Sequence, residues 1–155
     1  MKYEVTKLLD GYTICFRQWN AKHSHCKFLH GYAISFKLYF KADDLDENNW
    51  VWDFGWLKNK DFKIDGMPAK EWFSYMFDHT VLISEDDPAL DQFEKLDKDG
   101  IIKLRVIPQQ SCEKMSEFVF DKVNKLVKEI TQGRVKLHRV DTFEHNKNCA
   151  SFISS

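Results

Sequence analysis

Three of the six histidines and one of the four cysteines fall within ten residues, at His23, His25, Cys26 and His30. Imidazole is the commonest protein ligand for a metal such as zinc, and a thiol beside a cationic centre can become a reactive thiolate. This spacing could therefore serve metal binding and catalysis together. The alternatives are hydrogen-bonded histidines at strand ends and an inert buried thiol at Cys26.

The chain has the length of one domain, and we assign residues 1–155 to a single domain with one core. Its formal net charge of -1 is spread over interleaved acidic and basic residues, which gives no broad positive face for nucleic acid or an anionic membrane. No apolar run is long enough for a membrane span, and the first residues lack the apolar middle of a secretory signal. We expect a cytoplasmic protein.

The cysteines are scattered and form no CxxC pair, so free thiols are expected in a reducing compartment. Cys15, Cys112 and Cys149 have no predicted role.

Apolar periodicity predicts the elements that must position these residues. A strand is expected at 12–22, and a second one with clear alternation at 28–41, joined as an antiparallel hairpin. Helices are expected from Pro68 to about 78, within 86–100, and from a Ser111 cap to Gly133. Two further strands are expected at 101–108 and 135–143.

This order predicts an α+β domain, with an antiparallel four-stranded sheet and helices packed on one face. A sheet of so few strands has exposed edges, and continuing it between subunits would cover them. We therefore expect a homo-oligomer.

Several short segments, in chain order, resemble the 6-pyruvoyltetrahydropterin synthase and 6-carboxytetrahydropterin synthase family of the tunnelling fold (T-fold). The resemblance covers most of the chain. The segments are Trp19–His23 for aromatic-x-Ala-x-His, Cys26–Tyr32 for Cys-x-x-Leu-His-Gly-His, Val51–Lys58 for Val-x-Asp-Phe-x-x-Leu-Lys, Asp78–His79, Ser111–Lys114 for a helix start, Glu144, and Ala150–Phe152 for Ala-x-Tyr.

The resemblance implies a zinc ion held by three ligands, which correspond here to His23, His30 and Tyr32. Tyr32 replaces the family's third histidine, and phenol is an uncommon zinc ligand, so His25 is the substitute that we weigh beside it. Residues 30 and 32 share a strand face, which preserves the family's geometry. The loop between His23 and Cys26 is also shorter than is usual in the family.

The resemblance further implies Cys26 as catalytic base and Asp78–His79, supplied by a neighbouring subunit, as its proton-relay partners. Glu144 would hold the pterin ring, because two acceptor oxygens suit the parallel N–H donors of an aminopyrimidine edge. The other interpretations are a helix end for Asp78–His79 and a solvated carboxylate for Glu144. Asp53 and Glu113 are interpreted as structural, and His145 has no assigned role.

The implied activity is that of a zinc-dependent lyase that converts 7,8-dihydroneopterin triphosphate to 6-carboxy-5,6,7,8-tetrahydropterin, with loss of acetaldehyde and triphosphate, in a deazaguanine (queuosine-type) pathway. The compact Cys-x-x-Leu-His motif favours this branch over the 6-pyruvoyl activity. The family also implies a trimer or hexamer in which the sheets join into a barrel. A second hypothesis is a catalytically weakened pterin-binding or metal-binding oligomer, suggested by Tyr32 and the short loop.

Overall fold

Two long strands form the centre of the sheet in the computed structural model, which describes residues 1–155. β1 (Tyr3–Phe16) and β2 (His30–Ala42) pair antiparallel, which confirms the predicted hairpin. β1 begins earlier than predicted and ends at Phe16, so residues 17–22 lie in the connecting loop. The alternation along β2 turns one row of side chains into the core: Ile34, Phe36, Leu38 and Phe40.

β1 contains a bulge opposite Ser35. Leu9 pairs with Phe36 and Tyr12 with Ile34, so two residues of β1 face one residue of β2. Gly11 has φ of 85°, a left-handed conformation that glycine adopts without a steric penalty. The extra residue lets both Leu9 and Tyr12 pack against the same core.

The sheet has six strands in the order β6-β5-β1-β2-β7-β8, so the predicted four-stranded sheet was wrong. The added strands are β5 (Thr80–Ser84) and β8 (Cys149–Ile153), beside β6 (Leu104–Ile107) and β7 (Lys136–Phe143). Strands β1, β2, β7 and β8 pair antiparallel, whereas β5 runs parallel to both β1 and β6. The sheet is therefore mixed rather than wholly antiparallel.

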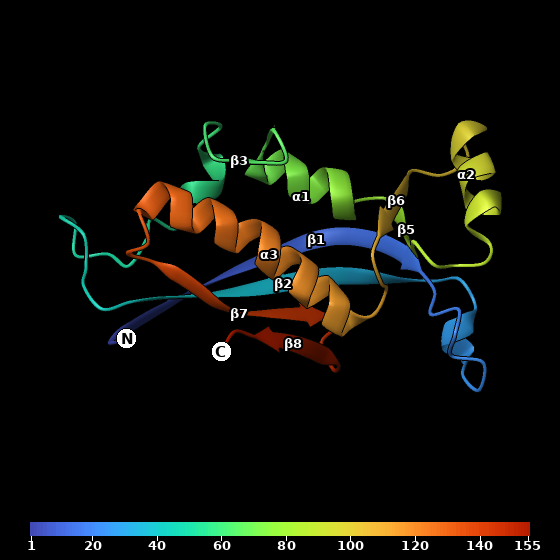
Figure 1. The fold of residues 1–155 in the computed structure, drawn as a ribbon, viewed down its shortest axis with the longest axis horizontal. Coiled ribbons are helices and arrows are strands. Elements are labelled where there is room, and N and C mark those ends of the chain that lie inside the picture. Colours follow the sequence, from blue (N-terminus) through green and yellow to red (C-terminus); the bar gives the residue numbers. More distant parts are fainter.

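Helices α1 (Ala69–Phe77) and α3 (Cys112–Thr131) cover one face of the sheet (Figure 1). The hydroxyl of Ser111 accepts a hydrogen bond from the Lys114 N–H, which confirms the predicted cap of α3. The helix ends in left-handed residues at Gln132 and Gly133. The predicted apolar stripe of α3 is buried in the core: Met115, Val119, Val123, Leu126 and Val127.

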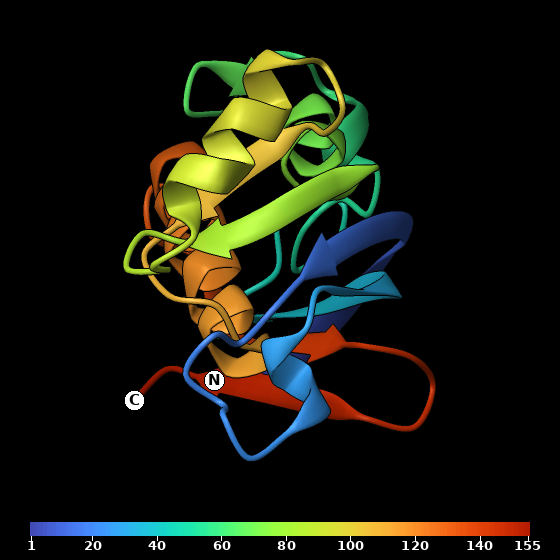
Figure 2. The same ribbon diagram turned by 90° about the vertical axis from the view of Figure 1, so that its right-hand side faces the viewer.

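Helix α2 (Leu90–Lys98) packs on the opposite face of β5, so the prediction that all helices share one face was wrong. Successive side chains of a strand point to opposite faces. Leu82 joins the core with α1 and α3, whereas Val81 and Ile83 form a second cluster with Phe93 of α2. Figure 2 shows α2 and α3 on opposite sides of β5.

The long connection between β2 and α1 contains the short helix η2 (Trp56–Lys58) and a small hairpin of β3 (Lys63–Ile64) and β4 (Met67–Pro68). Asp53 accepts a hydrogen bond from the Gly55 N–H at 2.7 Å, which fits the structural role expected for it. None of the helices combines the length and the apolar character that crossing a membrane requires.

Candidate functional site

The loop of residues 17–29 carries three of the predicted site residues, His23, His25 and Cys26. Its short helix η1 (His25–Lys27) is capped by the Ser24 hydroxyl, which accepts from the Cys26 N–H at 3.2 Å. The Gln18 N–H donates to the Cys26 carbonyl at 2.8 Å and closes the loop. Cys26 is half-buried, whereas His23 and His25 are exposed.

His30 and Tyr32 lie side by side at the start of β2, as the strand period predicts. Their ring centroids are 5.3 Å apart, with one ring edge-on to the other. Nδ1 of His30 lies 2.6 Å from the carbonyl oxygen of Phe28. A bond from Nδ1–H leaves Nε2 of His30 as the nitrogen able to bind a metal.

The predicted metal-ligand set of His23, His30 and Tyr32 stays a prediction. No three His, Cys, Asp or Glu side chains of the chain come close enough to one another to hold a metal ion. His23, His25 and His30 therefore do not supply a three-ligand set in this arrangement. Burial, and less strongly the charge of Glu144, raises the pKa of Tyr32, so its phenol is protonated at neutral pH.

Glu144 lines a small cavity at the end of β7, next to the first turn of α3. The cavity has a volume of about 220 Å³. Its lining also includes residues to which the sequence assigned no ligand role: Gln18, Cys112, Glu113, Asn148, Cys149 and Ala150. The cavity lies between the loop that follows β1, the start of α3 and the start of β8. The role of Glu144 in holding a ring stays a prediction.

Cys112 is the partner of Glu144, and the sequence had given it no role. Its thiol lies 3.4 Å from Oε1 of Glu144. Burial first, and then the Glu144 carboxylate, raises the pKa of the Cys112 thiol well above its ordinary value. Cys112 is therefore a protonated hydrogen-bond donor to Glu144 rather than a nucleophile.

His145 also lies at this end of the sheet, with its ring centroid 6.0 Å from that of Tyr32. Its Nδ1 accepts from the Lys147 N–H at 3.0 Å, and its Nε2 lies 3.3 Å from the side-chain nitrogen of Asn148. Nδ1 of His145 is thus used within the turn between β7 and β8. The sequence held one signal that His145 belongs to this site, namely its position directly after Glu144.

Asp78 and His79 form a hydrogen-bonded pair between α1 and β5. Nδ1 of His79 lies 3.0 Å from Oδ1 of Asp78, and the His79 N–H donates to the Thr13 carbonyl at 2.7 Å. His79 has φ of 56°, an uncommon conformation for a residue other than glycine. No hydrogen bond of the chain joins Cys26 to this pair.

A sequence model of the 6-pyruvoyl tetrahydropterin synthase family matches residues 6–154. The chain belongs to this family.

Two curated relatives are similar over part of their length, and both are named 6-carboxy-5,6,7,8-tetrahydropterin synthase. The protein of Rickettsia felis is 31% identical over 67 residues, which is 43% of each chain. That of Rickettsia typhi is 34% identical over 62 residues, which is 40% of this chain and 39% of the relative. The alignments thus span about two-fifths of these relatives.

Two solved structures share the fold over nearly the whole chain. An uncharacterized protein from Wolinella succinogenes superposes with a TM-score of 0.80 at 16% identity, covering 99% of this chain and 98% of that one. The 6-pyruvoyl tetrahydropterin synthase of Caenorhabditis elegans gives a TM-score of 0.60 at 16% identity, with 99% and 97% covered. At these identities the likeness establishes the fold.

Proposed function

We propose that the chain is a 6-carboxytetrahydropterin synthase, a lyase that converts 7,8-dihydroneopterin triphosphate to 6-carboxy-5,6,7,8-tetrahydropterin with release of acetaldehyde and triphosphate. Membership of the family and the names of the Rickettsia relatives support this reaction. The structural observation that carries it is the position of the Glu144 carboxylate in a cavity beside Tyr32 and Cys112.

In this proposal Glu144 accepts hydrogen bonds from the aminopyrimidine edge of the pterin and fixes the ring. Cys26, half-buried in the loop that borders Tyr32, acts as the base that removes a proton from the substrate side chain. Replacing Cys26 by alanine should lower the rate by about 10²- to 10⁴-fold, the usual worth of a positioned base.

Asp78–His79 relays the proton from a second subunit in this proposal. The pair is assembled within the chain, but no hydrogen bond connects it to Cys26. The outer edges of β6 and β8 are unpaired, so contacts between copies of the chain can continue the sheet. A trimer or hexamer would bring the pair of one copy to the cysteine of another.

Zinc remains a prediction, and no step above depends on it. When bound in such an enzyme, zinc acts as a Lewis acid on substrate oxygens. His30 offers a free Nε2, and His23 together with either Tyr32 or His25 would have to complete the site. Tyr32, which stands where the family has a histidine, favours one second candidate, a pterin-binding oligomer without turnover.

The deciding experiment is incubation of the purified protein with 7,8-dihydroneopterin triphosphate, with and without added zinc. Chromatography of the pterins and an acetaldehyde assay identify the products. Formation of 6-carboxytetrahydropterin with acetaldehyde supports the proposal, and a 6-pyruvoyl product without acetaldehyde assigns the sister activity. Retention of bound pterin without product would establish the second candidate. Elemental analysis of the same preparation measures the zinc content.

Subunit mixing tests the shared site. Cys26→Ala and His79→Ala are each expected to be inactive alone. Unfolding and refolding the two variants together should restore about a quarter of the wild-type rate. In a random mixture, about one shared site in four combines an intact Cys26 from one subunit with an intact His79 from another. Refolding each variant alone is the control. No recovery in a refolded mixed oligomer would assign Cys26 and His79 to the same subunit.

A further inference from the structure

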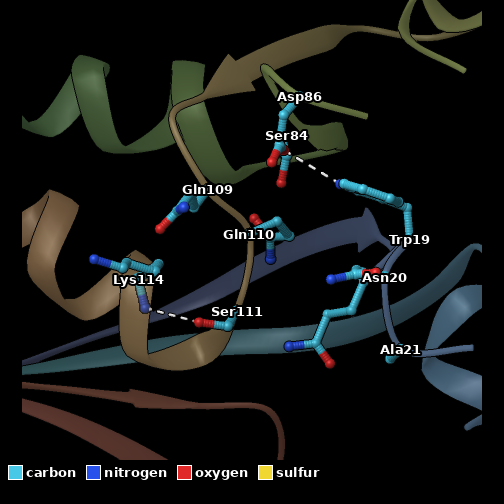
Figure 3. Close-up of a pocket in the computed structure, with 10 residues that line it drawn as sticks. Trp19, Asn20, Ala21, Ser84, Asp86, Gln109, Gln110, Ser111 and Lys114 are labelled. Atoms are coloured by element: carbon cyan, nitrogen blue, oxygen red, sulfur yellow. Dashed lines mark hydrogen bonds between the residues drawn. The ribbon is translucent and has the colours of Figure 1, made fainter. Parts of the chain in front are cut away.

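Two further hollows lie at opposite ends of the sheet. The one drawn in Figure 3, of about 430 Å³, borders the Glu144 cavity because Gln18 lines both, so it belongs to the candidate site. The amide of Gln110 in its wall is buried without a hydrogen-bond partner and is closed off from the hollow. The other hollow, of about 330 Å³, lies between the N-terminal residues and the loop after β2. The function proposed above does not use it.

This other hollow, which we name the Trp50 pocket, is lined by residues 2–5, 45, 49–52 and 54. β1 starts beside it at Tyr3 and ends at Phe16, next to the loop that carries Cys26. A strand rises about 3.4 Å per residue, so the 14 residues of β1 place the pocket roughly 40 Å from that loop. Figure 1 shows the N-terminus and the loop after β2 at one end of the sheet, and the loop between β1 and β2 at the other.

Three aromatic rings of the Trp50 pocket are exposed. Tyr3 is 45%, Trp50 49% and Phe54 57% exposed. Trp52 completes the aromatic lining; it is 7% exposed and stacks on Trp56, with ring centroids 4.7 Å apart. Exposed apolar side chains that gather around a hollow indicate a binding site, whereas single ones do not. The volume is within the range of small-molecule sites.

The loop that carries Trp50 is held in place from two sides. Asp46 accepts hydrogen bonds from the N–H groups of Asn48 and Trp50, each at 2.9 Å. The guanidinium of Arg134 donates to the Val51 carbonyl at 2.9 Å and to a second carbonyl of the loop at 3.1 Å. The backbone therefore presents the Trp50 ring in a fixed position, which lowers the entropy cost of binding a ligand.

The same loop carries an excess of negative charge. Residues 42–57 contain no lysine or arginine, but they contain five carboxylates: Asp43, Asp44, Asp46, Glu47 and Asp53. Two of the five have cationic partners, since the N-terminal amine lies 3.3 Å from Asp43 and Arg134 lies 4.0 Å from Asp46. The other three form no ion pair, so the loop attracts cations.

Two further charges line the pocket itself. Glu4 lies 3.6 Å from Nζ of Lys41 and 2.7 Å from Nε2 of His138, so its carboxylate already has partners. Lys2 adds one positive charge, against the three unpaired carboxylates of the loop. This balance repels nucleic acid, an anionic membrane and the same surface of a second copy. It favours a cation as the occupant.

The lining also selects the kind of cation. A primary ammonium or a guanidinium group carries N–H donors that need acceptors, but seven of the ten lining residues are hydrophobic. A quaternary ammonium group has no N–H to satisfy. Its charge attracts the negative faces of aromatic rings, and its methyl groups pack against them.

We propose that the Trp50 pocket binds a small quaternary ammonium compound. The rings of Tyr3, Trp50 and Phe54 contact its methyl groups, and the unpaired carboxylates of Asp44 and Glu47 attract its charge. Because the pocket lies at the opposite end of the sheet from Glu144, this proposal does not depend on the pterin reaction.

The test follows choline binding to the full chain through the indole N–H signals in ¹⁵N NMR spectra. The matched probe is 3,3-dimethyl-1-butanol, which has the shape of choline but a carbon in place of the charged nitrogen. Choline should bind about tenfold more tightly, because only the cation is attracted to the ring faces and the carboxylates. The Trp50 signal should shift on titration, whereas that of Trp19, at the other end of the sheet, should not.

Trp50→Leu should weaken choline binding, followed at the Phe54 amide, by about threefold to tenfold, because leucine is apolar but has no aromatic face. Tyr75→Leu is the matched control at a ring of α1 that is 48% exposed, and it should leave the affinity unchanged. The double variant Asp44→Asn, Glu47→Gln should weaken choline binding by about threefold and leave that of the neutral alcohol unchanged.

Three results would overturn the proposal. One is a choline titration without a saturable shift at Trp50, including one that shifts Trp19 instead and so places the cation near Glu144. Another is equal affinity for choline and the neutral alcohol. The third is binding to phosphatidylcholine vesicles without binding of free choline; no vesicle binding is expected, because the lipid phosphate would meet Asp44 and Glu47. The wild-type comparison of the two probes stands even if a variant does not fold.

Discussion

The thiol of Cys112 lies 3.4 Å from Oε1 of Glu144, so the first turn of α3 donates a hydrogen bond to the carboxylate at the end of β7. The two residues are 32 positions apart in the sequence. Their contact places a neutral donor against the carboxylate that we propose to hold the pterin, and it gives that carboxylate a fixed orientation.

Cys112 should react slowly with thiol reagents. Burial and the neighbouring Glu144 charge raise the pKa of its thiol, and the thiolate is the reactive form. Timed alkylation with iodoacetamide at pH 8, followed by peptide mass spectrometry, should modify the exposed Cys149 well before Cys112. Glu144→Gln should speed the modification of Cys112 without reaching the rate of Cys149, because burial is the larger cause. Equal rates in the wild type would contradict this assignment.

Glu144→Gln should weaken pterin binding by about tenfold to a hundredfold, since a hydrogen bond to a charged group contributes more than a neutral one. Fluorescence titration with neopterin measures the dissociation constant. Glu113→Gln is the matched control, because Glu113 lines the same cavity but is exposed at the start of α3. It should change the constant by less than about threefold. Equal losses in both variants would point to the total charge of the cavity instead.

The protein should lose stability in acid through Asp87 and Asp141. Burial alone would raise each carboxyl pKa, but hydrogen bonds outweigh it and the pKa of both groups is lowered. The donors are Arg17 and the Ala89 N–H for Asp87, and Arg139, Ser151 and Tyr39 for Asp141. The unfolded chain therefore binds more protons than the folded chain at acidic pH.

This stabilisation is present above the unfolded carboxyl pKa of about 3.9 and is lost as the pH falls through the lower folded value. Urea unfolding between about pH 6 and pH 2 should show the fall in the free energy of unfolding. Asp87→Asn should cost about 2 kcal/mol at neutral pH and flatten the curve. The control is Asp43→Asn, at a side chain 62% exposed, which should do neither. A wild-type curve that is flat below pH 4 would refute the prediction.

Phe36→Ala should destabilise the fold by about 3–5 kcal/mol, because the ring is fully buried and its removal leaves a cavity. The ring packs against Tyr12, Phe73 and Phe77, which joins β1 and α1 to the central strand. Phe54→Ala is the matched change at a ring that is 57% exposed, and it should cost less than about 0.5 kcal/mol. Urea denaturation of both variants provides the comparison.

Local patterns were sufficient for α3 and β2. The apolar stripe and the Ser111 cap specify the helix, and the alternation over residues 30–42 specifies the strand. β5 was missed because it is buried on both faces and shows no alternation. The predicted strand beyond Phe16 was wrong because Arg17 and Trp19 bond instead to Asp87 and Asp86 after β5.

The candidate site divides in the same way. The sequence by itself determined that His30 and Tyr32 share one face, because both lie on the same strand two residues apart. It also determined that Asp78 and His79 are adjacent, because a single peptide bond joins them. Only the tertiary structure decided that Cys112 meets Glu144 and that the amide of Gln110 is buried without a partner. Those relationships depend on how separate elements pack, and no local pattern of residues encodes them.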